Sequence, residues 1–347
     1  MNKKLREYGI NLGHLPTGKN NLITDVAGVT VGHVTLDSGS IKTGVTAIIP
    51  HEGNIFREKL VSASHVINGF GKTQGLVQVD ELGTIETPII LTNTLSVGTA
   101  HKAVVGYMLG ENSDIGDTTG TVNPIIGECN DGVLNEIRTP SVTEKHVLEA
   151  ISSADIIFQQ GNVGAGTGMV CYDLKGGIGS ASRMVKLGDS EYTVGILVLS
   201  NFGSMEDLMI RGNPIGEKIK EELSLKDPGK DKGSIMVILA TDIPLSSLQL
   251  KRLLKRTQSG IARTGGYTGN GSGEVAIGFT TANKVMHYEE RAFTDQKVIH
   301  EDLLDMVFKA TVEATEEAVL NSLICSNTTV GRNNKKILSL KDFAKFL

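Results

Sequence analysis

Cysteine is scarce in this 347-residue chain, and long apolar runs are missing. Cys129, Cys171 and Cys325 lie far apart without CxxC or Cys/His ligand spacing, so we expect buried free thiols rather than a disulfide framework or a zinc site. No stretch approaches ~18 apolar residues, and the N-terminus lacks the apolar core of a signal peptide. The sequence therefore predicts a cytoplasmic protein with no membrane partner.

An excess of positive charge is also missing. The 39 acidic residues outnumber the 34 basic ones, for a net charge of -5, and no dense basic stripe is present, which argues against nucleic acid as a partner. The motifs GxSxG, HExxH and the P-loop are absent, and the eight histidines form no ligand cluster. A GxGxG pattern within residues 161–182 lacks the acidic residue that a dinucleotide site needs. We expect no metal and no cofactor.

Glycine, in contrast, is abundant. Its 41 residues are about 12% of the chain, against a usual ~7%. Hydrophobic residues make up 39% and charged residues 21%, as in a globular protein. With only 8 prolines and no G-X-Y period, the glycine excess indicates shaped turns and close backbone approaches rather than collagen or linker.

Strand-like and helix-like patterns interleave without a strict βαβ rhythm, which predicts a layered α/β architecture in a single domain, residues 1–347. Strands are expected at 29–36, 44–49, 88–92, 192–201, 234–241 and 274–281, and helices around 104–109, after 141, and at 214–223, 244–261 and 301–324. Capping-box spacing of Ser141 and Glu144 predicts the start of one helix, and the helix over 301–324 is expected to have one apolar face. A polar loop over 225–233 forms the sharpest boundary.

Ser234 opens an apolar strand directly behind that loop, where a hydroxyl could become an N-terminal nucleophile. It can attack the Gly233 carbonyl, because glycine has no side chain to block the approach. Hydrolysis of the resulting ester frees an α-amine whose pKa of ~7.7 to 8 suits a base at neutral pH. The residues alone leave a plain turn before a strand as the alternative, since Gly-Ser occurs five times in the chain.

Four further polar residues could support such chemistry. Ser272 and Glu274, two apart in GNGSGE at a strand entrance, lie on the same side and could polarise a nucleophile, or they belong to a glycine-rich turn. Asn201 ends an apolar strand, where its amide could donate to an oxyanion or cap a turn. Glu128 lies in GECNDG, interpreted as a polar turn, where it could bind a substrate ammonium or be solvated.

Seven segments, taken together, are more specific than any one of these residues. They are LITDVAGVTVGHVTL, TGVTAIIP, TNTLSVG, GECNDGVLNEI, GAGTGMVCYDLKGGIGSASR, KGSIMVILATDIPL and ARTGGYTGNGSGE, in chain order. The chain resembles, over roughly residues 20 to 332, the self-processing L-aminopeptidase/D-amidase-esterase family of N-terminal-nucleophile serine peptidases, which includes the β-peptidyl aminopeptidases. The resemblance implies an αββα sandwich like that of N-terminal-nucleophile hydrolases, with a different connectivity shared with ornithine acetyltransferases.

The resemblance also implies scission between Gly233 and Ser234 into chains 1–233 and 234–347, with Ser234 as the nucleophile. Ser272 and Glu274 match the pair that supports the nucleophile, and Asn201 matches the residue that helps to form the oxyanion hole.

On the substrate side, Glu128 matches the glutamate that receives the substrate's free amino group. Asn130 stands two positions later, where some members carry an aromatic residue, so the substrate preference of those members is not carried over.

The hypothesis is thus an autocatalytically processed, metal-free serine aminopeptidase or amidase that releases N-terminal residues from small peptides, amides or esters through an acyl-enzyme. Two alternatives stay open: an acyltransferase on the same fold, and an unprocessed homologue that binds a small molecule. The resemblance favours a homo-oligomer, a tetramer.

Overall fold

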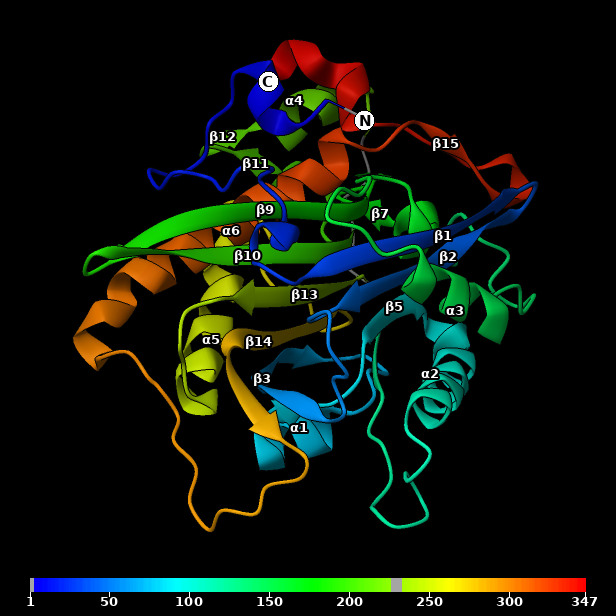
Figure 1. Ribbon diagram of the computed structural model, residues 1–347. Helices are drawn as coiled ribbons and strands as arrows, with labels where there is room; N and C mark the ends of the chain where they lie inside the picture. Colours follow the sequence, from blue (N-terminus) through cyan, green and yellow to red (C-terminus); the bar gives the residue numbers. More distant parts are fainter. Residues whose placement is uncertain (1–2, 226–232) are drawn as a thin grey trace.

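The computed structural model describes residues 3–225 and 233–347, in which two β-sheets face each other and helices cover their outer sides (Figure 1). The four-stranded sheet has the order β1-β2-β5-β6. Its strands are β1 (Thr30–Ser38), β2 (Ile41–Ile49), β5 (Ile89–Asn93) and β6 (Ile125–Cys129). Strands β5 and β6 run parallel, and the other pairs of this sheet are antiparallel.

The six-stranded sheet has the order β4-β3-β14-β13-β10-β9. Its strands are β3 (Glu58–Gly69), β4 (Thr84–Ile85), β9 (Gly177–Leu187), β10 (Ser190–Asn201), β13 (Ser234–Thr241) and β14 (Gly273–Met286). Strand β13 is central, parallel to β14 and antiparallel to β10. Three two-stranded sheets complete the strands: β7 (Val170–Cys171) with β8 (Leu174–Lys175), β11 (Met209–Ile210) with β12 (Asn213–Pro214), and β15 (Thr329–Val330) with β16 (Lys336–Ile337).

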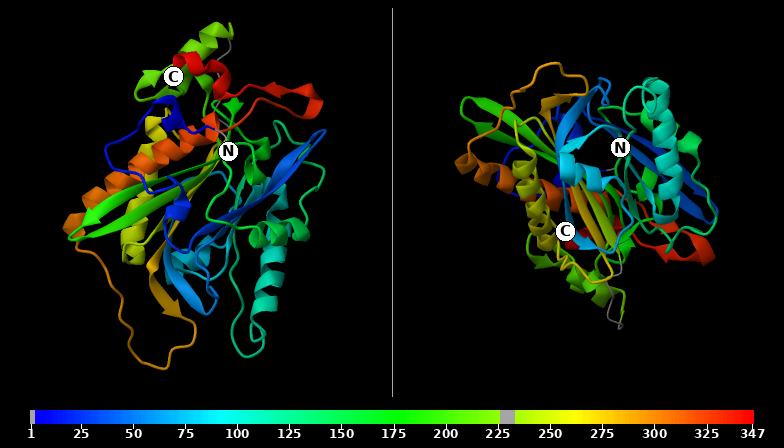
Figure 2. Two further views of the ribbon diagram at one scale, coloured as in Figure 1. Left: turned by 45° about the horizontal axis from the view of Figure 1, so that its top comes forward. Right: turned by 90° about the horizontal axis from the view of Figure 1, so that it is seen from below.

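Helices form the two outer layers (Figure 2). Helices α2 (Val97–Glu111) and α3 (Glu144–Ser152) pack on the four-stranded sheet, and α5 (Ser247–Arg263) and α6 (Leu304–Ile324) pack on the six-stranded sheet. The shorter helices are α1 (Leu76–Leu82), beside β3, and α4 (Ile215–Glu222). The predicted αββα layering is confirmed.

Alternation along β13 divides its side chains between two cores. Met236 and Ile238 share a core with residues of the four-stranded sheet such as Ile126, whereas Ile235 and Val237 belong to the core that contains residues of α5 and α6. Because side chains of a strand point alternately to its two faces, Ser234 shares the face of Met236, toward the other sheet.

Several expectations from the sequence need correction. Strand β13 begins and ends where predicted, but the Ser141–Glu144 capping box is wrong, because Thr143 is the N-cap of α3 and pairs with His146. The residues expected on one face of α6, at positions 304, 307, 311, 314, 318 and 324, are all buried. Over residues 313–324 the burial extends around the whole helix, since this half lies among the sheet, α5 and the N-terminal segment. Of the predicted loop over 225–233, residues 226–232 lie outside the described residues.

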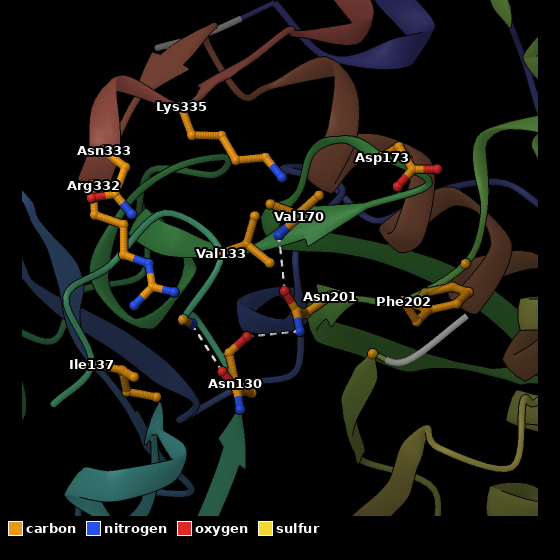
Figure 3. Close-up of a pocket in the computed structure, with 13 residues that line it drawn as sticks. Asn130, Val133, Ile137, Val170, Asp173, Asn201, Phe202, Arg332, Asn333 and Lys335 are labelled. Atoms are coloured by element: carbon orange, nitrogen blue, oxygen red, sulfur yellow. Dashed lines mark hydrogen bonds between the residues drawn. The ribbon is translucent and has the colours of Figure 1, made fainter. Parts of the chain in front are cut away.

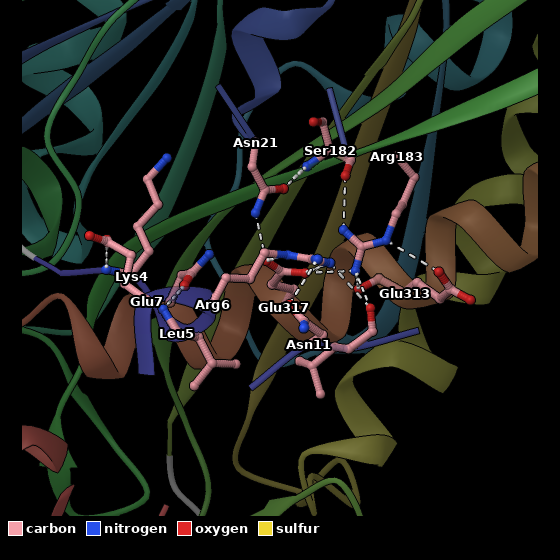
Figure 4. Close-up of polar contacts among 12 residues, drawn as sticks. Lys4, Leu5, Arg6, Glu7, Asn11, Asn21, Ser182, Arg183, Glu313 and Glu317 are labelled. Carbon is pink, nitrogen blue, oxygen red and sulfur yellow. Dashed lines mark hydrogen bonds and ion pairs between the residues drawn. The ribbon is translucent and has the colours of Figure 1, made fainter. Parts of the chain in front are cut away.

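Residues 3–25, here called the N-terminal strap, are tied to α6 by a buried ionic network (Figure 4). On β9, Arg183 Nη2 lies 2.7 Å from Glu317 Oε2, and its Nε lies 3.2 Å from Glu313 Oε2. From the strap, Arg6 Nε lies 2.7 Å from Glu317 Oε1. Burial raises the pKa of Glu317, but the cations of Arg6 and Arg183 outweigh it and hold this pKa below its ordinary value. The network thus joins residues before position 233 to residues after it.

All three cysteines are free and buried, as expected. None of the helices within residues 3–225 and 233–347 is long and apolar enough to cross a membrane.

Candidate active site

Ser234 is the first residue of β13 and is 5% exposed. Its register partners are Asn201, the last residue of β10, and Gly273, the first residue of β14. Directly paired residues point to the same face of a sheet with their Cβ atoms ~5 Å apart. The hydroxyl of Ser234 and the amide of Asn201 are therefore neighbours on the face toward the other sheet.

Cys129, at the end of β6, faces Ser234 across the space between the sheets. Burial raises the pKa of the Cys129 thiol well above its ordinary value, and a hydrogen bond with the Ser234 side chain only partly offsets this. The thiol therefore stays protonated and cannot act as a competing nucleophile at neutral pH. This contact is also independent evidence for the direction of the Ser234 side chain.

Gly233 fits its place only because it has no side chain. A Cβ there would lie 1.8 Å from the Asn201 carbonyl oxygen and 2.5 Å from Phe202 Cα, both backbone atoms of the neighbouring strand end. The Gly273 amide donates a hydrogen bond of 3.1 Å to the Gly233 carbonyl oxygen. The carbonyl beside Ser234 is thus held by a backbone donor.

Ser272 and Glu274 form the predicted pair. Ser272 Oγ donates to Glu274 Oε1 at 3.0 Å, and Thr268 Oγ1 donates to Glu274 Oε2 at 2.9 Å. The register partner of Glu274 is Ile235, which belongs to the core beneath the helices. The carboxylate therefore lies on the sheet face opposite the Ser234 side chain, and its interaction with Ser234 would go through the backbone nitrogen rather than the hydroxyl.

The Asn201 amide has a defined orientation. The Val170 amide donates to Asn201 Oδ1 at 2.9 Å, which identifies the oxygen, and Nδ2 donates to the Asn130 carbonyl at 3.1 Å. A carboxamide nitrogen carries two protons, so one donor is left for a ligand.

A cleft of about 620 Å³ lies beside this amide (Figure 3). Its lining residues are Asn130, Gly132, Val133, Ile137, Val170, Asp173, Asn201, Phe202, Gly203, Gly233, Arg332, Asn333 and Lys335. The cleft thus brings together three predicted residues, Asn130, Asn201 and Gly233. Ser234, Ser272, Glu274 and Glu128 do not line it.

Glu128 is not in a polar turn: it lies within strand β6 and is 4% exposed, so this prediction is wrong. Its Oε1 accepts a hydrogen bond of 2.8 Å from the Lys72 amide, and its Oε2 accepts one from Thr94 Oγ1. Strand β6, which was not predicted, can hold this glutamate because its carboxylate is hydrogen-bonded inside the fold.

Within the part of the chain that the structure describes, no group of three or more His, Cys, Asp or Glu residues is placed to hold a metal ion.

The profile of peptidase family S58 matches residues 21–337. The chain belongs to this family. It is 36% identical over 359 residues to beta-peptidyl aminopeptidase BapA of Sphingosinicella microcystinivorans. The match covers 97% of this chain and 89% of the relative. The solved structure of the PH0078 protein from Pyrococcus horikoshii OT3 superposes with a TM-score of 0.94 at 50% identity, covering 99% of this chain and 98% of that one.

A second solved structure supports the fold. The L-aminopeptidase D-Ala-esterase/amidase from Ochrobactrum anthropi, described as a prototype for the serine aminopeptidases with a variant of the Ntn hydrolase fold, has a TM-score of 0.90 and 34% identity over 99% of both chains. The predicted family and the predicted N-terminal-nucleophile hydrolase fold are confirmed, and this S58 peptidase is a hydrolase.

Three charged residues of the S58 peptidase's cleft were not predicted: Asp173, Arg332 and Lys335. Asp173 lies in the turn between β7 and β8, and the two cations lie in the β15–β16 hairpin. No sequence signal pointed to them, because the hairpin reaches the cleft only through tertiary packing of a segment some 100 residues after Ser234.

Two buried titratable groups, Lys175 and Asp131, influence each other's ionisation. Burial lowers the pKa of Lys175 to about 7, although its Nζ donates to three backbone carbonyls at 2.7 to 3.0 Å. Burial raises the pKa of Asp131, next to Asn130 in sequence, to about 6. Each charge opposes the shift of the other, since each favours the ionised form of its partner.

Proposed function

We propose that the chain cuts itself between Gly233 and Ser234 and then works as an N-terminal-nucleophile serine aminopeptidase. Membership of peptidase family S58 gives the reaction class, and similarity to BapA and to the Ochrobactrum enzyme supports the release of N-terminal residues from small peptides, amides or esters. One observation carries the residue assignment: Ser234 and Asn201 are direct cross-strand partners beside the cleft that Gly233 lines.

Self-cleavage begins when Ser234 Oγ attacks the Gly233 carbonyl carbon. The Gly233–Ser234 C–N bond breaks, the hydroxyl proton passes to the leaving nitrogen, and the acyl group is left as an ester on Oγ, which water hydrolyses. The Gly273 amide, already on the carbonyl oxygen at 3.1 Å, would stabilise the charge that develops there. The close backbone contacts of Gly233 support this geometry, because they restrict the position to glycine.

In the mature enzyme the new α-amine of Ser234 takes the proton of its own hydroxyl. Ser272 and Glu274, on the opposite face of the sheet, would hold the resulting ammonium, since a carboxylate favours the charged form. The free Nδ2 proton of Asn201 would stabilise the oxyanion of the substrate. The C–N bond of the substrate then breaks, the ammonium gives its proton to the leaving amine, and hydrolysis of the acyl-enzyme completes the cycle.

Substrate selection in this proposal rests on Glu128, whose carboxylate would receive the free amino group, and on Asn130, which lines the cleft. The functional unit is one domain built from chains 1–233 and 234–347, and the proposal includes a cytoplasmic homo-oligomer, a tetramer.

The mass spectrum of the purified protein tests maturation. We expect two chains that co-purify, one of 233 residues and one of 114 (347 minus 233). Ser234→Ala should stay a single chain and be inactive on an aminoacyl p-nitroanilide, because both steps use the same hydroxyl. Ser40→Ala, in the exposed Gly39–Ser40 pair, is the matched control and should mature normally. An intact mass after long incubation would refute self-cleavage, and a new N-terminus other than Ser234 would refute the assignment.

A further inference from the structure

The cleft beside Asn201 carries a positive edge that the proposed mechanism does not use. Arg332 and Lys335 both line it, and Figure 3 shows Lys335 extending from the hairpin toward Val170 and Arg332 extending toward Ile137. The carboxylate of the lining is Asp173, whose Oδ2 already accepts a 3.0 Å hydrogen bond from the Met205 amide.

The described part of the chain neutralises these cations only in part. Arg332 Nη1 forms a long ion pair with Glu136 Oε1 at 3.9 Å, beyond hydrogen-bond distance, and the Arg332 side chain is about one-third exposed. For Lys335 the described residues provide no ion pair within 4.0 Å. The Lys335 ammonium and the hydrogen-bond donors of the Arg332 guanidinium are thus available to an anion.

The hairpin that carries them is firmly anchored. The Arg332 amide donates to the Leu134 carbonyl at 2.8 Å, and a Cβ on Gly331 would lie 2.3 Å from that same carbonyl oxygen. Asn333 and Asn334 adopt φ values of 54° and 56°, a left-handed turn that asparagine tolerates. The two cations therefore project from a fixed turn and not from a loose tail.

The position of the cleft assigns it to the leaving group. Strand β13 separates Gly273 on one side from Asn201 on the other. Glu128 is close to the Gly273 side: a Cβ on Gly71 would lie 3.5 Å from Glu128 Oε1 and 3.8 Å from Gly273 Cα. The cleft lies on the Asn201 side. With the substrate's amino group at Glu128 and its scissile carbonyl at Asn201, the remainder of the substrate extends into the cleft.

We propose, on the basis of the function proposed above, that Arg332 and Lys335 bind the C-terminal carboxylate of the leaving peptide. Guanidinium and ammonium groups suit a carboxylate, and Val133, Ile137 and Val170 offer apolar surface for its side chains. The substrates favoured by this chain are consequently short peptides with a free carboxyl end, in preference to the matching C-terminal amides.

Kinetics on a tripeptide and on the same tripeptide with a C-terminal amide test this. For the wild type, kcat/KM should be higher for the free acid, and the preference should shrink with added salt. Arg332→Gln and Lys335→Gln should each lower the acid-to-amide ratio by about 5- to 10-fold, mainly through KM for the acid. Lys336→Gln removes the same charge from the same hairpin at a position outside the cleft and should leave the ratio unchanged.

Binding provides a readout that does not need turnover. Glycylglycine should bind the cleaved enzyme more tightly than glycylglycinamide does, and Arg332→Gln should remove the difference. Equal losses on acid and amide in Arg332→Gln, an equal effect of Lys336→Gln, or equal binding of the two dipeptides would overturn the proposal. A wild type that shows the binding difference but cleaves no substrate would instead refute the proposed function.

Discussion

Replacing Arg183 with methionine should lower the free energy of unfolding by about 3 kcal/mol, because it leaves buried carboxylates without their cation. Methionine fills much of the space of the fully buried side chain, so the change tests charge rather than volume. The carboxylates that lose contacts are those of Glu313 and Glu317, which are 1% and 0% exposed.

The size of the expected stability loss follows from the hydrogen bonds that each carboxylate keeps when Arg183 is removed. Breaking a buried ion pair by removing one partner costs about 3 to 5 kcal/mol. Glu317 keeps its two bonds from Arg6 and one from Asn21 Nδ2, while Glu313 keeps the amides of His14 at 2.9 Å and Leu15 at 3.0 Å. These remaining partners place the expected loss at the low end of that range.

Arg6→Met is the matched control. Arg6 is 28% exposed and shares Glu317 with Arg183, so its loss should cost only about 1 kcal/mol after solvent screening. Urea unfolding in a Ser234→Ala background keeps each variant as one chain and makes the transitions comparable. In the cleaved enzyme, Arg183→Met should also lower the urea concentration at which the chains separate, because the network joins α6 to residues before position 233.

Equal and small losses in Arg183→Met and Arg6→Met, below about 1 kcal/mol, would refute this reasoning. Such losses would mean that water solvates the two carboxylates in place of Arg183, although the structure shows their side chains as buried.

Three further predictions concern the site. Asn201→Ala should lower kcat by ~10² to 10³ on protein confirmed to be cleaved, and Asn201→Asp, which keeps the acceptor but loses the donor, should be equally impaired; unchanged kcat would remove Asn201 from the oxyanion hole. Glu128→Gln should raise KM for substrates with a free amine and spare an N-blocked ester, whereas equal losses on both would argue against ammonium binding. Because the unfolded chain binds the Lys175 proton up to about 10.5 but the folded chain only to about 7, stability should rise with pH between these values, above the range where Asp131 titrates. Urea titrations at pH 7 and 9 should show this slope in the wild type and lose it in Lys175→Met, and a flat wild-type profile would contradict the lowered pKa.

Strand β13, which begins with Ser234, was predictable because its apolar composition and its flanking polar loop indicate the same boundaries. An apolar run of eight residues follows a polar loop, and β13 is buried along its whole length, so strand boundaries and burial coincide. The Ser272–Glu274 pair was predictable for a similar reason, since residues two positions apart in an extended segment share a side, and the structure joins them at 3.0 Å.

Strand β9 could not be predicted, because its glycines suggest a turn. A Cβ on Gly179 would lie 1.9 Å from the Ala318 carbonyl of α6. Glycine is thus placed in the strand to let a helix approach, which is a tertiary demand that local propensity does not contain.

The cleft was only half predictable. Asn130, Asn201 and Gly233 lie in segments with recognisable patterns, whereas Arg332 and Lys335 belong to a polar hairpin whose sequence gives no sign of where it packs. Its position is set by contacts of Gly331 and Arg332 with Leu134, over 190 residues earlier in the chain.

Because side chains of β13 point alternately to the two faces of the sheet, the position of the cut decides which face the new N-terminal side chain occupies. A cut one residue later would present Ile235, whose side chain faces the helices, so a serine introduced there could not meet Asn201. A cut two residues later would restore the direction but remove two register pairs from each flank of the central strand. Residues around position 234 can therefore be substituted, but a nucleophile at position 235 would lie on the wrong face of the sheet to reach Asn201.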